Sequence, residues 1–191
     1  MTKNNLAIIV LNWNGADDAL ECISSLARQT LKPAIIIVDN HSHDDSVMRF
    51  EQYQTKHPSV DCTIIANDKN LGFAGGINTG LVHARKQGFE YIGVLNPDAV
   101  ADKNWCRALV DELSSQLKCG IATGILQRRD SKTLDTTGDF YTTWGLPGPR
   151  NRDEPVENAP SKPGEVFGAT GGGAIYRAAI FDDIDMFDED F

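Results

Sequence analysis

The sequence lacks the features of a membrane-spanning or nucleic-acid-binding chain. Its longest apolar run, residues 6–11, has six residues, whereas a membrane-spanning helix needs about 20. Positive charge is also scarce, since 18 Lys and Arg stand against 27 Asp and Glu, a net charge of −9. Proteins that bind nucleic acids or anionic membranes use clustered Lys and Arg. We therefore expect no nucleic-acid partner and no transmembrane segment.

Cysteines are few and widely spaced. The chain has four, Cys22, Cys62, Cys106 and Cys119, and no two of them form a CxxC motif. Metal clusters and redox-active disulfides usually rely on such close spacing. The sequence therefore predicts buried free thiols of the kind kept in reducing compartments. We expect a cytoplasmic protein, with the inner face of the membrane as the alternative location.

The 191 residues, 41% of them hydrophobic, are enough for one domain, 1–191, with a substantial core. Five short apolar runs are continuous rather than alternating, as in strands buried on both faces of a parallel sheet. They are residues 6–11, 34–38, 62–66, 91–95 and 121–126. Helical spacing of apolar residues lies between them, at 16–26, 46–53, 77–84 and 105–117. This alternation predicts an α/β fold with a doubly wound, mostly parallel sheet.

The pattern changes after residue 126. Residues 130–165 carry five prolines and four glycines, which exclude a long helix or a central strand. A turn at residues 171–173 and an apolar segment at 174–176 follow. We therefore expect the five strands and their helices to be complete by Leu126, with 1–126 as the nucleotide-binding half and 127–191 as the beginning of a second half. The chain stops in an apolar and acidic segment, and we expect it to be C-terminally truncated.

Polar residues follow four of the apolar runs, at 12–15, 39–42, 67–76 and 96–98. Ligands of open α/β sheets bind at the carboxyl ends of the strands. Asn, Asp and Gly also simply form turns, so each segment alone is ambiguous. Because all four converge on one edge, the sequence predicts a ligand site there.

The chemistry of these segments suits a phosphorylated ligand and a metal. Pro97 stiffens the turn that presents Asp98, and Mg²⁺ takes one or two carboxylates together with substrate phosphates. Asp39 could accept hydrogen bonds from a base or a ribose. The glycine-rich stretch 72–76 opens a helix, where free N–H groups favour a phosphate or a sugar. It matches neither GxGxxG nor GxxxxGK, which argues against dinucleotide and Walker sites.

Taken together, these motifs resemble the family 2 inverting glycosyltransferases with the GT-A fold, nearest to rhamnosyltransferase-like members. The matching stretches are residues 8–14, 37–42, 70–80, 95–98 and 171–191. The resemblance implies transfer of a sugar, with rhamnose as a candidate, from a UDP- or dTDP-sugar to a glycan or lipid-linked acceptor. Such hexosyltransferase chemistry belongs to polysaccharide biosynthesis.

The resemblance also implies which residues bind the donor. They are Leu11, Asn12, Trp13, Asp39, Asn40, Gly75, Gly76, Asn78, Asn96 and Asp98. On this interpretation the first three line the nucleoside pocket and Asp39 binds the base. The two glycines and Asn78 border the ribose and the diphosphate. Asp98 is the carboxylate that holds a divalent cation, Mg²⁺ or Mn²⁺, in a motif whose first acid is here replaced by Asn96.

The end of the chain departs from the family pattern. The general base is expected in a Glu-Asp pair that would follow Phe191, and the acids at 188–190 are expected to serve capping and solvation. An apolar group near the end is expected to lack packing partners and to favour self-association. It comprises Phe181, Ile184, Met186, Phe187 and Phe191.

Two other functions fit parts of the sequence. A sugar-nucleotide nucleotidyltransferase would also be an α/β enzyme that uses Mg²⁺. It would need a glycine-rich loop with Lys or Arg directly after the first strand, and residues 12–15 carry no such charge. The other alternative is a catalytically incomplete fragment that binds the donor without transferring the sugar.

Overall fold

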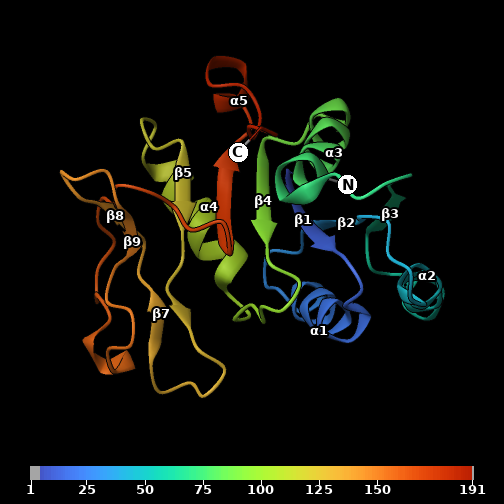
Figure 1. Ribbon diagram of the computed structural model, residues 1–191, viewed down its shortest axis with the longest axis horizontal. Coiled ribbons are helices and arrows are strands. Elements are labelled where there is room, and N and C mark those ends of the chain that lie inside the picture. Colours follow the sequence, from blue (N-terminus) through green and yellow to red (C-terminus); the bar gives the residue numbers. More distant parts are fainter. Residues whose placement is uncertain (1–4, 191) are drawn as a thin grey trace.

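The computed structural model describes residues 5–190 and is built around a six-stranded sheet with the order β3-β2-β1-β4-β10-β5 (Figure 1). The strands are β1 (Leu6–Asn12), β2 (Ala34–Asp39), β3 (Cys62–Ala66), β4 (Tyr91–Leu95), β5 (Ile121–Thr123) and β10 (Gly173–Arg177). Strands β1 to β4 are parallel, and β10 is antiparallel to both of its neighbours. The sheet is therefore mixed and mostly parallel, which confirms the predicted fold class.

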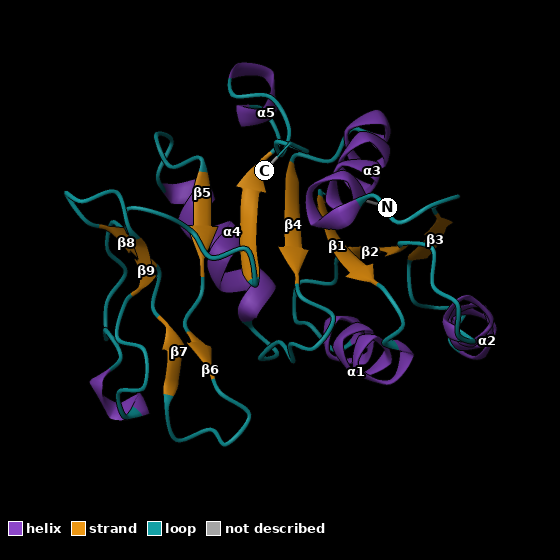
Figure 2. Ribbon diagram, in the orientation of Figure 1, coloured by secondary structure: helices purple, strands orange, loops and turns teal. Residues whose placement is uncertain are grey.

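Helices cover both faces of the sheet (Figure 2). They are α1 (Ala16–Ala27), α2 (Ser46–Lys56), α3 (Gly72–Gln87), α4 (Trp105–Ser115) and the short α5 (Ile180–Asp183). Side chains of α1, α2 and α4 pack in one apolar core, and those of α3 and α5 pack in the other. The sheet thus separates two cores.

The central strand β1 shows why the apolar runs are continuous. Leu6, Ile8 and Val10 point into the first core, and Ala7 and Ile9 point into the second. All five side chains are at most 1% exposed. Because both faces are covered, each position along the strand is apolar, as the sequence predicts.

The prediction of one strand over residues 121–126 is wrong, because this stretch is divided between two short strands. β5 ends at Thr123, and Leu126 belongs to β6 (Leu126–Gln127), which pairs with β7 (Leu134–Thr136) in a separate two-stranded sheet. Gly124 lies at the break, where a Cβ atom would approach the Trp105 indole nitrogen to 3.0 Å. The backbone therefore passes close to this indole at the point where the apolar run is divided between two sheets.

The expectation that the main strands are complete by Leu126 is also wrong. β10 lies between β4 and β5 (Figure 1), with Ala174 opposite Val94 on one side and Thr123 on the other. Ile175 packs in the first core and Tyr176 in the second. Residues 173–177 therefore join the two predicted halves in one sheet.

Residues 126–172 form an arm beside the main sheet, at the left of Figure 2. Besides β6 and β7 it contains β8 (Asp139–Tyr141), which pairs with β9 (Pro147–Pro149), and the 3₁₀ turn η1 (Val156–Asn158). The expected absence of a long helix or a central strand is confirmed for this stretch.

The expectation of unpacked apolar side chains near the end is wrong for most of them. Phe181 is 5% exposed and packs beside Tyr176, with ring centroids 5.5 Å apart. Met186 and Phe187 are partly buried against the second core. Ile184 is exposed as expected, at 65%, and Phe191 lies outside the described residues. The apolar surface that was expected to drive self-association is therefore largely covered.

None of the helices within residues 5–190 is long and apolar enough to cross a membrane.

Candidate functional site

The strand register brings Asn12 and Asp39 together at the carboxyl edge of the sheet. They are paired residues in the parallel ladder of β1 and β2, and each is the last residue of its strand. Their side chains are 0% and 2% exposed. Both strands extend one residue beyond the predicted apolar runs, so these polar groups are held by the sheet itself.

Ser42 completes a buried network with these two residues. Asn12 donates through Nδ2 to Asp39 Oδ1 (2.9 Å) and to Ser42 Oγ (3.2 Å). Ser42 donates through Oγ to Asp39 Oδ1 (2.6 Å) and through its backbone N to Asp39 Oδ2 (2.9 Å). Among residues 5–190 the carboxylate thus accepts three hydrogen bonds, two at Oδ1 and one at Oδ2, so the network fixes the loop after β2.

Asn12 Oδ1 is buried and has no hydrogen-bond partner among the described residues. A buried acceptor without a partner costs about 1–3 kcal/mol, and native structures contain few of them. This acceptor is therefore an unsatisfied polar atom within the network, at the end of β1. A Cβ atom at Gly15 would lie 3.5 Å from it.

Trp13 lies in the loop directly after β1 and is 57% exposed. This loop is tied to the loop after β2, because Asn14 N donates to Ser42 Oγ (2.9 Å) and His43 N donates to Asn14 Oδ1 (2.7 Å). Asn14 adopts a positive φ of 52°. The indole is therefore presented to solvent by an ordered loop, where it can stack on a planar group.

Asn40 organises the loop that precedes α3. Its Nδ2 donates to Asn70 Oδ1 (2.9 Å) and Gly72 O (3.0 Å), and its Oδ1 accepts from Asn67 Nδ2 (3.0 Å) and Leu71 N (3.0 Å). All four hydrogen-bonding positions of the amide are occupied. Asn40 therefore shapes the site, and direct contact of its side chain with a donor stays a prediction.

The glycines at the start of α3 allow close approach of three segments. A Cβ atom at Gly76 would lie 2.5 Å from Leu11 Cδ1, and one at Gly75 would lie 2.8 Å from Leu71 Cβ and 3.4 Å from Glu189 Oε2. Contacts shorter than 3.0 Å force neighbouring atoms to move. These glycines therefore let the first turns of α3 lie against β1, and Gly72 N at the start of the helix donates to Asn70 Oδ1 (2.8 Å).

The side chain of Asn78 links α3 to the end of the chain, and its predicted place beside the ribose and diphosphate stays a prediction. Its side chain is 5% exposed and contacts the end of the chain. Nδ2 donates to Phe187 O (2.8 Å) and Glu189 Oε1 (2.8 Å), and Oδ1 accepts from Phe187 N (3.0 Å). Sequence reasoning did not find this link, because the neighbours of Asn78 and Glu189 in the chain do not indicate a partner more than 100 positions away.

Asn96 and Asp98 lie in the turn after β4. Asn96 N donates to Gly172 O (3.0 Å), and Ala99 N donates to Asn96 O (3.1 Å). The turn is thus held against the segment that leads into β10. The predicted pair lies at the same edge as the ends of β1 and β2, because β4 runs parallel to β1 in the sheet.

Arg129 of the arm reaches the Asp98 turn, and no motif in the sequence indicated it. Its Nη2 donates to Asp18 Oδ1 of α1 (2.6 Å) and to the backbone O of Asp98 (3.4 Å). The hydrogen bond that Arg129 donates to Asp18 is the main cause that raises the pKa of Arg129 above its ordinary value, and the negative charge of Asp98 adds to it. The arm therefore brings a positive charge beside the candidate metal carboxylate.

The fit of a divalent cation rests on few protein ligands. Within residues 5–190, no group of three or more His, Cys, Asp or Glu side chains is arranged to hold a metal ion. A carboxylate at Asp98 with the amide oxygen of Asn96 suits Mg²⁺ or Mn²⁺ only when donor phosphates and water complete the shell, which is the usual arrangement for Mg²⁺. The residues thus fit a metal that binds together with its nucleotide.

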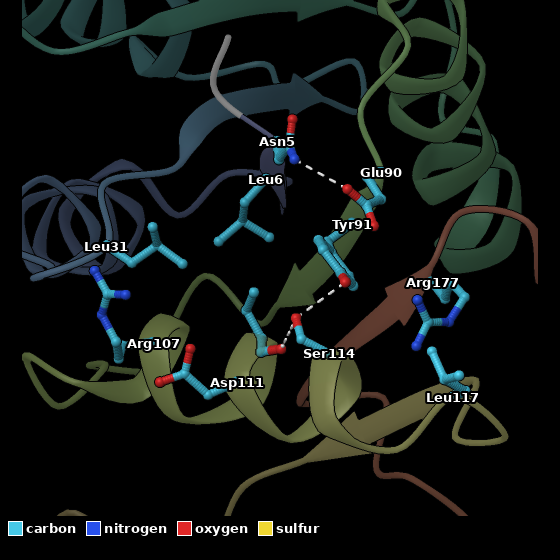
Figure 3. A pocket seen from close by; sticks show the side chains of 11 residues that line it. Asn5, Leu6, Leu31, Glu90, Tyr91, Arg107, Asp111, Ser114, Leu117 and Arg177 are labelled. Atoms are coloured by element: carbon cyan, nitrogen blue, oxygen red, sulfur yellow. Dashed lines mark hydrogen bonds between the residues drawn. The ribbon is translucent and has the colours of Figure 1, made fainter. Parts of the chain in front are cut away.

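A cavity of about 460 Å³ lies at the opposite edge of the sheet. It is lined near the amino ends of β1 and β4, where Asn5 donates to Glu90 Oε2 (2.9 Å) and Tyr91 Oη lies 3.1 Å from Ser114 Oγ (Figure 3). Its lining includes none of the predicted site residues. The candidate site at the carboxyl edge is therefore separate from this cavity.

The mixed sheet and the polar residues at its carboxyl edge define a GT-A glycosyltransferase fold. Residues 7–185 match the family described as Glycosyl transferase family 2. The chain belongs to this family.

The solved structures that share the fold include the following two. One is the mannosyltransferase PcManGT from Pyrobaculum calidifontis in complex with GDP-Man and Mn²⁺, with a TM-score of 0.71 and 16% identity over 97% of this chain and 48% of that chain. The other is S. aureus TarS 1–349 in complex with UDP, with a TM-score of 0.67 and 17% identity over 97% of this chain and 51% of that chain.

Among curated proteins, the galactofuranosyltransferase GlfT1 of Mycobacterium tuberculosis is 30% identical over 102 residues, which are 53% of this chain and 32% of the relative. This chain therefore spans about half the length, or less, of these relatives.

Proposed function

We propose that this chain binds a nucleoside-diphosphate sugar at the carboxyl edge of its sheet and contributes to transfer of the sugar to a glycan or lipid-linked acceptor. The observation that carries the proposal is the buried network of Asn12, Asp39 and Ser42, which ends β1 and β2 beside the glycine-rich start of α3. Family membership and the fold it shares with nucleotide-bound glycosyltransferases support the same function.

The nucleoside would occupy the space beside Leu11, Asn12 and Trp13. The exposed indole of Trp13 offers a stacking surface, and the open Asn12 Oδ1 can accept one hydrogen bond. Asp39 Oδ2 keeps one lone pair for a donor such as the imide N–H of a pyrimidine. These acceptors favour uracil or thymine, and hence a UDP- or dTDP-sugar.

The diphosphate would lie between the start of α3 and the Asp98 turn. Leu71 N and Gly72 N at the start of α3 already donate to Asn40 Oδ1 and Asn70 Oδ1, so the N–H groups that follow them in the first turn would donate to phosphate oxygens. Asp98, with Asn96, would hold Mg²⁺ or Mn²⁺. When bound, the cation supplies charge neutralisation for the departing diphosphate.

The transfer itself would follow the inverting route of the family resemblance. An acceptor hydroxyl attacks the anomeric carbon, the bond to the diphosphate breaks, and the proton of the hydroxyl passes to a carboxylate. A hexose, with rhamnose as a candidate, remains our proposal for the sugar, polysaccharide biosynthesis for the process, and the cytoplasm for the location.

Calorimetry with the 191-residue chain tests the proposal directly. UDP, dTDP and GDP would each be titrated with Mg²⁺, with Mn²⁺ and with EDTA, and ATP would serve as a nucleotide that lacks a diphosphate end. We expect UDP or dTDP to bind with a divalent cation and ATP to bind at least about tenfold more weakly, which is about 1.4 kcal/mol. Absence of binding for all three diphosphates would overturn the proposal.

A further inference from the structure

One side chain of α3, Asn78, joins the last described residues to the candidate donor site. Its Nδ2 donates to the backbone O of Phe187 (2.8 Å), and its Oδ1 accepts from the backbone N of Phe187 (3.0 Å). It also donates to Glu189 Oε1 (2.8 Å). Because Asn78 is 5% exposed, water competes little at its end of these bonds, although Glu189 itself is exposed, and the three bonds together fix the position of the segment.

Aromatic packing holds the same segment along the first turns of α3. The Phe187 ring lies edge-on to Phe73, with centroids 6.4 Å apart, and edge-on to Tyr176 of β10 at 6.0 Å. A Cβ atom at Gly171 would lie 3.8 Å from Phe73 Cζ. The segment is therefore packed between α3 and β10, and Glu189 follows two residues later.

These contacts place the Glu189 carboxylate above the first turns of α3. Its Oε2 lies 3.4 Å from the position that a Cβ atom of Gly75 would occupy, while Oε1 accepts from Asn78. Gly75 is one of the glycines that would border the diphosphate. A carboxylate is thus held at the donor site by a buried amide, with one oxygen directed past a residue that has no side chain.

We propose that Asn78 is a positioning residue and that Glu189 recognises hydroxyl groups of the donor sugar. This inference rests on the proposed function. In the part of the chain that the structure describes, no Lys, Arg or His forms an ion pair with Glu189, so its charge is not cancelled locally. A carboxylate repels a diphosphate and accepts strongly from O–H groups. Its place beside the diphosphate therefore suits the adjoining sugar.

The test compares two ligands that differ only in the sugar. Calorimetry would measure the binding of UDP and UDP-galactose, and of dTDP and dTDP-rhamnose, to the parent chain and to Glu189→Gln. The amide oxygen of Gln can still accept from Asn78, so the segment stays in place. We expect the affinity for the nucleotide sugar to fall about tenfold or more, as for loss of a charge-assisted hydrogen bond, and the affinity for the free diphosphate to change less than about twofold.

Two further variants separate positioning from general effects. Asn78→Asp keeps the shape and replaces the Nδ2 donor by an acceptor, so it should reproduce the selective loss of nucleotide-sugar affinity. Asp188→Asn removes the charge of a neighbouring residue whose side chain accepts a hydrogen bond from Asp190 N (3.0 Å). It should leave the affinities for the diphosphate and for the nucleotide sugar unchanged. Circular dichroism would verify that each variant is folded.

The possible outcomes distinguish the inference from the proposed function. Equal losses for diphosphate and nucleotide sugar in Glu189→Gln, or equal effects of Glu189→Gln and Asp188→Asn, would overturn the role of Glu189. So would unchanged nucleotide-sugar affinity with slower transfer, which is the result expected of a general base. Failure of the parent chain to bind any nucleoside diphosphate would instead overturn the proposed function, and this role with it.

Discussion

The side chains of Asn12 and Asp39 are joined by a hydrogen bond of 2.9 Å at the ends of two neighbouring parallel strands. This bond links the position of the Asn12 amide to a carboxylate that is only 2% exposed. An ionised carboxylate at this depth is tolerated because Ser42 also donates to it twice. The nucleoside end of the proposed donor site therefore depends on a prearranged polar network.

Asp39→Ala should weaken both the fold and nucleotide binding. The change leaves Ser42 N and Ser42 Oγ without their acceptor and removes one of the two acceptors of Asn12 Nδ2, at a cost of about 1–3 kcal/mol of unfolding free energy. We expect UDP or dTDP binding to weaken by a similar amount, about 1–3 kcal/mol. Urea unfolding and calorimetry measure the two effects.

Ser42→Ala is the matched control for Asp39, because it removes the Oγ bonds and keeps the carboxylate. If it weakens UDP binding as much as Asp39→Ala does, the carboxylate acts by positioning alone. A purine diphosphate that binds the parent chain as tightly as UDP and dTDP would contradict base recognition by Asp39.

Asp98→Asn should abolish the metal dependence of nucleotide binding. The amide keeps the size of the side chain and removes the charge that would hold the cation. We expect the gain in UDP affinity on adding Mg²⁺ or Mn²⁺ to shrink by about tenfold or more. Asp111→Asn, in the cavity at the opposite edge, should keep the gain. Equal metal dependence in Asp98→Asn and the parent would show that the cation site lies elsewhere.

Gly76→Ala should destabilise the protein because its Cβ would lie 2.5 Å from Leu11 Cδ1. Overpacking of this kind costs about 1–3 kcal/mol. Combining it with Leu11→Ala should recover part of that cost, since the clashing atoms are gone, and urea unfolding of the four chains gives the coupling energy. Gly164→Ala, where nothing lies within 4 Å, is the control. Additive costs of the Gly76 and Leu11 changes would show that the two residues are not in contact.

The positions of the first four strands and of a candidate site after them could be predicted because their signals are local. Continuous apolar runs such as residues 34–38 arise when both faces of a strand are covered, and Asp39 follows directly. Turn residues after parallel strands fall at one edge by the geometry of the fold. The residues of the candidate site could therefore be proposed from the sequence, whereas their hydrogen bonds could not.

The parts of the fold and of the site that could not be predicted depend on contacts between segments that are distant in the sequence. The insertion of β10 beside β4 rests on the contact of Ala174 with Val94, and an antiparallel strand of five residues gives the same apolar signal at any position in the sheet. The bond from Asn78 to Glu189 spans 111 residues. Such contacts are selected by three-dimensional packing, and no spacing in the sequence encodes them.

The cysteines should differ sharply in their reactivity. Burial raises the pKa of Cys22 and Cys106 to about 12 and that of Cys62 to about 11, with nearby carboxylates adding to the effect at Cys22 and Cys62. A raised pKa keeps the unreactive thiol at pH 8, where only about 1 in 10³ to 10⁴ molecules would be thiolate. We expect an aromatic disulfide reagent to label only the partly exposed Cys119 in the native chain and all four thiols in urea. Rapid native labelling of Cys119→Ser would contradict the burial of the other three.

The fold of the nucleotide-binding half should depend on β10. Ile175 is fully buried between β4 and β5, so Ile175→Ala should lower the unfolding free energy by about 2–5 kcal/mol. The same substitution at Ile125, which is 44% exposed, should change it by less than about 0.5 kcal/mol. Urea unfolding measures both values.

A fragment of residues 1–126 extends this prediction, because it lacks the strand that joins β5 to β4. We expect it to show no cooperative urea transition, since β5 would lose its only partner in the sheet and both cores would lose the side chains of β10. A cooperative transition in the fragment, together with a small cost for Ile175→Ala, would show that the first half folds by itself. In that case β10 would be an addition to a complete sheet, and its place between β4 and β5 would contribute little to stability.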